Sequence, residues 1–188
     1  TKSFSNALKG ALREDPDGIL VCEMRDLETI SLAISAAETG HLVFGTLHTS
    51  SAAQTVDRIV DVFPPAQHQQ VRVQLSNSLV AVLSQCLVPK HNPKPGEFGR
   101  VMAQEIMVVT PGISNMIREG KTAQIYGAIQ TGGRLAMQTL EMALADLYKS
   151  NVISFESAMS KTSRPEEIQR LIGGNPNNAK APAKAGRR

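Results

Sequence analysis

One stretch of this chain carries most of its structural information: Asp15-Pro16-Asp17-Gly18-Ile19-Leu20-Val21-Cys22-Glu23-Met24-Arg25-Asp26. Its apolar residues 19–22 follow a turn signal, and this pattern predicts a short, fully buried strand. Three charged residues come directly after the strand, namely Glu23, Arg25 and Asp26. Ligands of open α/β sheets bind outside the carboxyl ends of the strands, so we expect a functional site at this point.

A second apolar run, residues 42–45, ends in a similar way in the polar segment 46–49. If the two runs form parallel strands, they bring the carboxylate of Glu23 and the imidazole of His48 to one crevice. Since parallel strands end at the same edge of a sheet, the two side chains would then belong to one site.

Apolar periodicity predicts helices in most of the remaining chain. They are expected over residues 4–12, 27–38, 52–62, 66–87, 112–119, 122–131, 137–149, 154–161 and 164–172. A Pro/Gly/Lys loop at 89–99 precedes a further strand at 101–109. Alternating strands and helices are typical of a parallel sheet, so the predicted fold class is α/β. We expect residues 1–110 to form the sheet-containing core, 111–172 a helical subdomain, and 173–188 a disordered basic tail without apolar periodicity.

Composition sets the broad class of the protein. A chain of 188 residues with 41% hydrophobic residues can bury a real core, and no apolar run approaches the length of a membrane span. The formal charge of +3 lies largely in the tail and does not by itself indicate nucleic-acid binding. Two cysteines, Cys22 and Cys86, fit a reducing compartment, and both are expected to be buried thiols. The chain opens on Thr1 rather than Met, and we expect it to be part of a longer protein.

Several motifs, in the right order, resemble those of the secretion and type IV pilus ATPases. Residues 15–26 resemble the Walker B region of that family, with Cys22 where the family usually has Gly. Residues 40–49 resemble its His box. The similarity continues through residues 57–64, 99–106 and 117–121. Within the family, the chain is most similar to the retraction ATPases that drive twitching motility.

This resemblance implies a hexameric, RecA-like ATPase that hydrolyses ATP with Mg²⁺. The C-terminal part of its ATPase core would be followed by the helical subdomain. Implied partners are identical subunits and the inner-membrane platform proteins of the pilus machinery. The protein would be cytoplasmic, would contact the membrane only through those partners, and would bind no specific nucleic acid.

The strand ends supply the candidate site residues. Glu23 is a candidate catalytic carboxylate that holds Mg²⁺ through water, which suits a cation that keeps most of its hydration. The resemblance implies that His48 binds the γ-phosphate, with His41 as the second histidine of the box, and Thr46 could supply a hydroxyl. Arg25 is a further catalytic candidate. Alternatively, Glu23 forms an ordinary ion pair with Arg25, and either histidine is purely structural.

Two further candidates concern subunit contacts and motor output. Arg58 could act across a subunit boundary, or it could pair with a nearby acid. Residues 112–119 match the place of the family's Ala-Ile-Arg-Asn-Leu-Ile-Arg-Glu motif, which implies a role for Arg118 and Glu119 in retraction. Gly112, Ser114 and Met116 depart from that motif. Alternatively, the apolar residues of the segment form only a buried stripe, which is compatible with the first interpretation. Three residues make that stripe: Ile113, Met116 and Ile117.

No Gly-x-x-x-x-Gly-Lys-Ser/Thr loop occurs in the 188 residues. The family carries this loop upstream, so we expect the present chain alone to be inactive and its His-box strand to have an unpaired apolar edge. Pilus-extension and type II secretion ATPases are the close alternative. They usually carry a four-cysteine zinc module where residues 88–100 have no cysteine. A non-catalytic pilus-assembly module and, more weakly, a nucleic-acid translocase remain alternatives of other classes.

Overall fold

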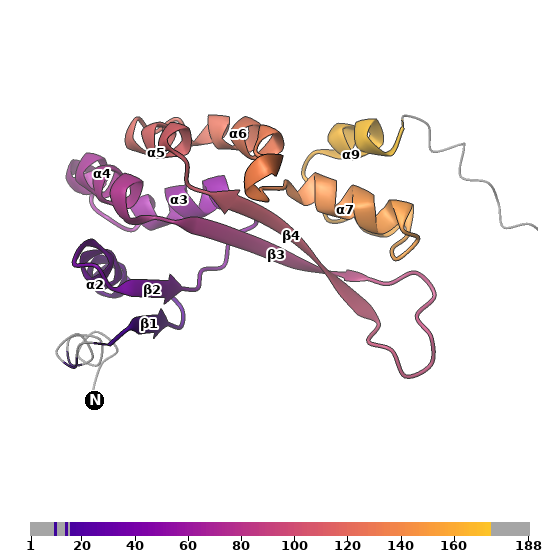
Figure 1. The fold of residues 1–188 in the computed structure, drawn as a ribbon, viewed down its shortest axis with the longest axis horizontal. Helices are drawn as coiled ribbons and strands as arrows, with labels where there is room; N and C mark the ends of the chain where they lie inside the picture. The colour runs from indigo at the N-terminus through magenta and orange to yellow at the C-terminus, as the bar shows by residue number, and fades with distance from the viewer. Residues whose placement is uncertain (1–9, 11–13, 15, 174–188) are drawn as a thin grey trace, which may run out of the picture. The chain divides into compact units, whose positions relative to one another are not determined.

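The computed structural model describes Gly10, Glu14 and residues 16–173 (Figure 1). Apart from Gly10 and Gly173, the helix predicted over 4–12 and the tail predicted over 173–188 lie outside these residues. The chain divides into two compact units. The first comprises Thr1–Ser84 with Glu105–Thr139, and the second comprises Gln85–Gln104 with Leu140–Arg188. The division at residues 110 and 172 that the sequence suggested stays a prediction.

The first unit opens with a β-α-β motif. Strand β1 (Gly18–Val21) pairs in parallel with β2 (Leu42–Gly45), in a register that sets Val21 opposite Gly45. Helix α2 (Leu27–Glu38) connects the strands and begins where the Asp26 carboxylate accepts a hydrogen bond from the Thr29 amide. The predicted α/β fold, its two parallel strands and the helix between them are therefore confirmed.

The predicted complete burial of the first strand is wrong. Ile19 and Val21 are buried against α2, whereas Leu20 is 65% exposed and Cys22 is exposed. The reason is that α2 covers one face of this two-stranded sheet, so burial alternates along β1. Cys22 is consequently not a buried thiol.

Helix α3 (Ala52–Asp61) follows β2 and is capped by Ser51; a 3₁₀ turn, η2 (Pro65–Gln67), then leads into α4 (His68–Ser78). The helix predicted over 66–87 is wrong in its second half, because the chain leaves α4 and forms strand β3 (Ala81–Pro89). Burial alternates along β3, as in a strand with one covered face. Cys86 therefore lies on a strand, half-buried, and burial raises the pKa of its thiol.

Strand β4 (Arg100–Val108) confirms the strand predicted at 101–109, and it pairs with β3. Backbone hydrogen bonds at both ends of the pair, Lys90 N to Gly99 O and Val109 N to Val80 O, fit an antiparallel hairpin. In the described residues β3 and β4 form their own two-stranded sheet, separate from β1 and β2.

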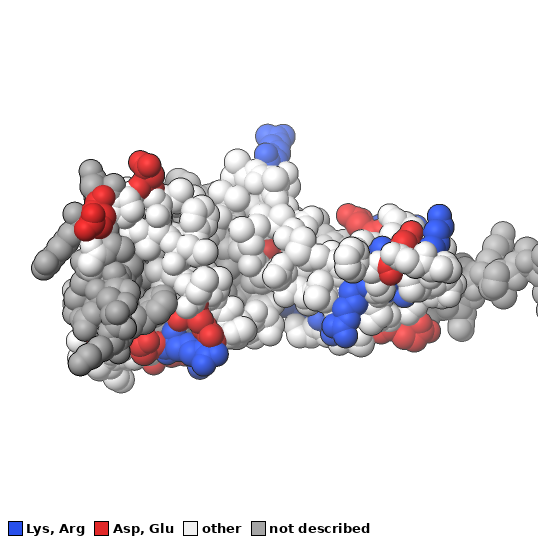
Figure 2. Space-filling view, turned by 90° about the horizontal axis from the view of Figure 1, so that it is seen from below, with Lys and Arg blue, Asp and Glu red and all other residues white. Residues whose placement is uncertain are grey.

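In the described residues after β4 the regular elements are helices, as the sequence predicted, apart from an isolated β-bridge between Gln138 and Ile106 of β4. The first unit contains α5 (Pro111–Arg118), η3 (Thr122–Gln124), α6 (Ile125–Thr131) and η4 (Gly133–Leu135). The second unit contains α7 (Leu140–Lys149), α8 (Phe155–Met159) and α9 (Pro165–Ile172). Among the described helices, none is both long and apolar enough to cross a bilayer. On the face drawn in Figure 2, acidic and basic side chains are interspersed.

One hydrophobic cluster joins the helices of the first unit. Val56 and Val60 of α3, Ile113 and Ile117 of α5, and Ile125 of α6 are all fully buried in it. The buried stripe that the sequence predicted in 112–119 is therefore present in Ile113 and Ile117, while Met116 is partly buried. This cluster holds α3 in place, and α3 is the helix that follows β2 and the polar segment 46–49.

Candidate functional site

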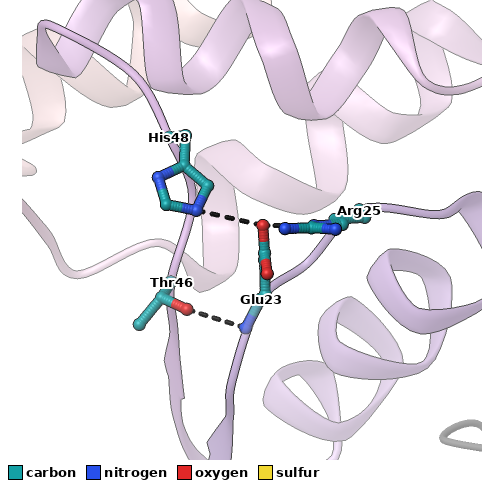
Figure 3. A network of polar contacts seen from close by, with 4 residues as sticks. All are labelled: Glu23, Arg25, Thr46 and His48. Carbon is teal, nitrogen blue, oxygen red and sulfur yellow. Dashed lines mark hydrogen bonds and ion pairs between the residues drawn. The ribbon is translucent and has the colours of Figure 1, made fainter.

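The ends of β1 and β2 bring Glu23 and His48 together. The Oε1 atom of Glu23 lies 3.0 Å from Nε2 of His48, and the same oxygen forms an ion pair with Arg25 Nε (Figure 3). The Glu23 side chain is 30% exposed, whereas His48 and Arg25 are 84% and 74% exposed. The carboxylate thus sits between two groups that project into solvent, one from each strand end. The geometry expected from the parallel strands is present, and so is the alternative ion pair between Glu23 and Arg25.

The charge of this carboxylate is maintained by its neighbours. The Arg25 guanidinium is the largest influence that lowers the pKa of Glu23 below its ordinary value. His48 acts in the same direction, and partial burial opposes both. Glu23 is therefore ionised at neutral pH, which is the state that a carboxylate needs in order to accept hydrogen bonds from water or to bind a cation.

The backbone of Glu23 is unusual. Its φ angle is 69°, in the left-handed region that residues with a Cβ rarely adopt. The Glu23 amide donates a 2.7 Å hydrogen bond to Oγ1 of Thr46, the residue directly after β2 (Figure 3). The Thr46 hydroxyl oxygen thus accepts a bond from the protein itself, and its predicted part in binding a nucleotide stays a prediction.

An open depression of about 470 Å³ adjoins His48. Its lining comes from the end of the segment after β2 and from α3: His48, Thr49, Ser50, Gln54, Asp57, Arg58 and Asp61. Thr122 donates a 3.0 Å hydrogen bond to Asp57 Oδ2. Within the described residues, no ion pair joins Arg58 to either acid of the depression. Arg58 and His48 therefore both line the depression. The structure does not support the alternative in which Asp57 or Asp61 neutralises Arg58.

Comparison with known proteins gives the family. The model of the family described as "Type II/IV secretion system protein" matches residues 1–170. The chain belongs to this family. It is 60% identical over 168 residues to the type IV pilus retraction ATPase PilT of Pseudomonas aeruginosa, an alignment that covers 89% of the chain and 47% of PilT. It is 52% identical to a twitching motility protein of Neisseria gonorrhoeae, covering 89% of the chain and 44% of that relative.

A solved structure agrees with these sequence relatives. The crystal structure of the pilus retraction motor PilT with bound ADP superposes with a TM-score of 0.80 at 49% identity, covering 90% of the chain and 46% of PilT. The chain thus spans about half the length of the relatives that it matches. The resemblance seen in the sequence motifs, and the assignment to this family of secretion and pilus proteins, are confirmed.

The second histidine of the family's His box lies elsewhere. His41 precedes β2, and its Nδ1 atom lies 3.1 Å from Thr39 Oγ1 and 3.3 Å from the Ala36 carbonyl oxygen. These contacts are at the C-terminal end of α2, so the structure does not bring His41 to Glu23. The predicted part of His41 in binding a nucleotide stays a prediction.

The segment that matches the family's retraction motif forms α5, which is hydrogen-bonded to α4. Arg118 donates to Ser76 Oγ and to Asn77 Oδ1, both at 3.3 Å. The Ser114 hydroxyl, which stands where the family motif has Arg, donates a 2.6 Å bond to the Ser76 carbonyl. The Ser114 bond satisfies a carbonyl in the last turn of α4, where carbonyl groups lack partners within the helix, and the Arg118 bonds go to side chains of the same turn. None of these contacts reaches the Glu23–His48 pair.

Glu119, the last residue of that motif, contacts its own helix and the following turn. Its carboxylate pairs with Lys121 Nζ at 2.6 Å and accepts a 3.0 Å bond from Asn115 Nδ2. Lys121 is the largest influence that lowers the pKa of Glu119.

Sequence reasoning missed one residue that supports the site. Glu105 of β4 is 4% exposed, and its Oε1 accepts a 2.7 Å hydrogen bond from the buried amide of Ala52. Ala52 is the first residue of α3, only four positions after His48. The signal was available, because strand alternation places Glu105 on the same face as Ala103 and Met107 and therefore predicts a buried carboxylate.

Proposed function

We propose that this chain supplies the Walker B and His-box part of an ATPase that retracts type IV pili. The observation that carries the proposal is the convergence of Glu23 and His48 at the ends of two parallel strands. The 60% identity to a protein named as a pilus retraction ATPase supports it. The phosphate-binding loop would come from sequence outside these 188 residues, which contain none.

The chemistry of Glu23 fits a magnesium nucleotide. Mg²⁺ keeps several of its waters and takes few protein ligands, so one ionised carboxylate is a sufficient contact through water. The contacts of Glu23 with Arg25 and with His48 both use Oε1, which fixes the direction of the carboxylate. Bound Mg²⁺ would neutralise charge on the phosphates. We assign Glu23 the role of orienting the water that attacks the γ-phosphate.

The polar groups around Glu23 have complementary roles in this proposal. His48 projects from its strand end beside the carboxylate, where its imidazole can donate a hydrogen bond to the γ-phosphate. Arg25 balances the carboxylate before nucleotide binds and can turn toward phosphate oxygens, and Thr46 lies within the same site. A cation that acts in the transition state of phosphoryl transfer raises the rate by roughly 10³ to 10⁵.

Assembly and location complete the proposal. We infer a homohexamer in which Arg58, on the wall of the open depression, faces the neighbouring subunit. Arg118 and Glu119 would transmit motion from α5 to the pilus machinery at the cytoplasmic face of the inner membrane. The partners there would be platform proteins of the pilus, and this chain would reach the membrane through them.

The test uses the complete ATPase and the Glu23→Gln substitution. Gln has nearly the same shape but no charge, so ATP hydrolysis should be abolished while ATP binding is retained. Calorimetry with Mg-ATP should also show no micromolar binding to the 188-residue chain alone, because it has no phosphate-binding loop. Turnover close to that of the parent in Glu23→Gln would show that Glu23 is structural, and the proposed function of the site would be wrong.

A further inference from the structure

Thr46 makes three separate hydrogen bonds around Glu23. Its amide donates to the Val21 carbonyl at 3.2 Å, its hydroxyl oxygen accepts from the Glu23 amide at 2.7 Å, and its carbonyl accepts from the Met24 amide at 2.9 Å. Thr46, which directly follows β2, thus binds three residues at the end of β1 and just after it. The first and third bonds are backbone bonds that any residue at this position could make, whereas the second needs a side-chain oxygen.

The side-chain bond is made to a residue with an unfavourable backbone conformation. Glu23 adopts φ = 69°, which is disfavoured for any residue that has a Cβ. The register of β1 and β2 ends at the pair Val21–Gly45, so the ladder of backbone bonds cannot by itself satisfy the Glu23 amide. The Thr46 hydroxyl replaces the missing ladder acceptor at that position. It therefore stabilises a conformation that the local sequence would not adopt on its own.

The neighbouring glycine makes room for the same turn. A Cβ on Gly45 would lie 2.6 Å from Cε and 2.8 Å from Sδ of Met24. Because Gly45 has no side chain, Met24 can lie over the strand end and contact the two apolar clusters of the first unit. Met24 therefore packs against the core, whereas the adjacent Glu23 side chain points toward His48.

We propose that Thr46 is a positioning residue, which orients the catalytic carboxylate by accepting a hydrogen bond from the Glu23 amide. This inference rests on the proposed function of Glu23 and refines the role of Thr46 from a general hydroxyl donor to the anchor of one backbone conformation. Without the hydroxyl, the Glu23 amide loses its acceptor, and the Glu23 carboxylate is held toward His48 less firmly.

Amide hydrogen exchange in the complete ATPase tests the contact directly. Thr46→Val keeps the β-branched shape and both backbone bonds but removes the acceptor. Exchange of the Glu23 amide should become about 10-fold faster, the factor that corresponds to losing one ordinary hydrogen bond. The Met24 amide is the internal control, because its acceptor is the Thr46 carbonyl and its exchange should not change. Thr46→Ser restores the hydroxyl and should restore the exchange rate of the parent.

Kinetics in the complete ATPase separate positioning from stability. Thr46→Val should lower kcat by about 10-fold or more with little change in KM for ATP, since misplaced catalytic groups slow chemistry rather than binding. Thr46→Ser should recover kcat. Thr131→Val, which removes a hydroxyl that among the described residues bonds to α6 carbonyls alone, is the matched control and should behave as the parent.

The possible results distinguish this inference from the proposed function. If Glu23→Gln abolishes hydrolysis but Thr46→Val changes neither Glu23 exchange nor kcat, the positioning role is wrong. Equal acceleration at Glu23 and Met24 would indicate local unfolding instead, and would also overturn it. If Glu23→Gln retains full turnover, the proposed function fails, while accelerated exchange at Glu23 alone would still establish the contact.

Discussion

Replacing Glu105 by Ala should destabilise the first unit by about 3 kcal/mol. The change removes the acceptor of the buried Ala52 amide, and an unsatisfied buried donor costs about 1–3 kcal/mol. It also removes a carboxylate from the N-terminus of α3, where a negative charge contributes roughly 0.3–1 kcal/mol through the helix dipole. The one lost methylene adds about 0.8 kcal/mol, less what the surroundings recover by relaxing. Glu105→Gln retains the shape and an acceptor oxygen, so it should lose only about 1 kcal/mol.

Urea unfolding and hydrogen exchange together measure this effect. The unfolding midpoint should fall in the order parent, Glu105→Gln, Glu105→Ala, with an unchanged dependence on urea concentration. The Ala52 amide should exchange fastest in the Ala variant. If Glu105→Ala loses less than about 1 kcal/mol and the Ala52 amide exchanges as in the parent, the carboxylate does not cap α3, and the reasoning is refuted.

Two further predictions concern a helix cap and the retraction segment. Asp26→Ala should lower the stability of the first unit by about 1 kcal/mol because α2 loses its cap, whereas Asp26→Asn should retain most of it in urea unfolding. The Thr29 amide lowers the pKa of Asp26, so this stabilisation is present at neutral pH and lost as the pH falls below about 4; in Asp26→Asn that part of the acid dependence should be absent. Arg118→Ala should leave ATP turnover of the complete ATPase within about twofold, since it breaks only two hydrogen bonds to the end of α4, but should impair surface motility. Loss of turnover in step with motility would instead assign Arg118 to the active site or a subunit interface.

Local patterns predicted the β-α-β motif well because its determinants are local. Asp26 lies where a cap is needed, and the apolar residues of α2 repeat with helical spacing. Parallel pairing of the strands follows from the helix between them, and the meeting of Glu23 with His48 follows from parallel pairing. This part of the candidate site could therefore be predicted from residue types and spacing alone.

The sequence predictions that are wrong have long-range causes. The apolar pattern of α4 continues through residues 79–87 and predicts a helix there. In the structure β4 offers a partner about 20 residues further on, and pairing with it overrides the local preference. The apolar run at residues 19–22 predicts a buried Cys22, because such runs are typical of strands covered on both faces, whereas α2 covers one face only.

The backbone conformation of Glu23, which gives the site its geometry, also depends on a contact between residues far apart in the sequence. The left-handed conformation of Glu23 has no signal in residues 19–26, since neither Glu nor its neighbours favour positive φ. Thr46, 23 residues further along the chain, supplies the bond that stabilises it. Glu105 likewise reaches Ala52 across 53 residues of sequence. A motif thus predicts which residue types meet at a strand end. The direction in which a carboxylate points depends on hydrogen bonds between residues far apart in the sequence. Conservative substitutions that remove one such bond, such as Thr46→Val, therefore separate effects on catalysis from effects on folding.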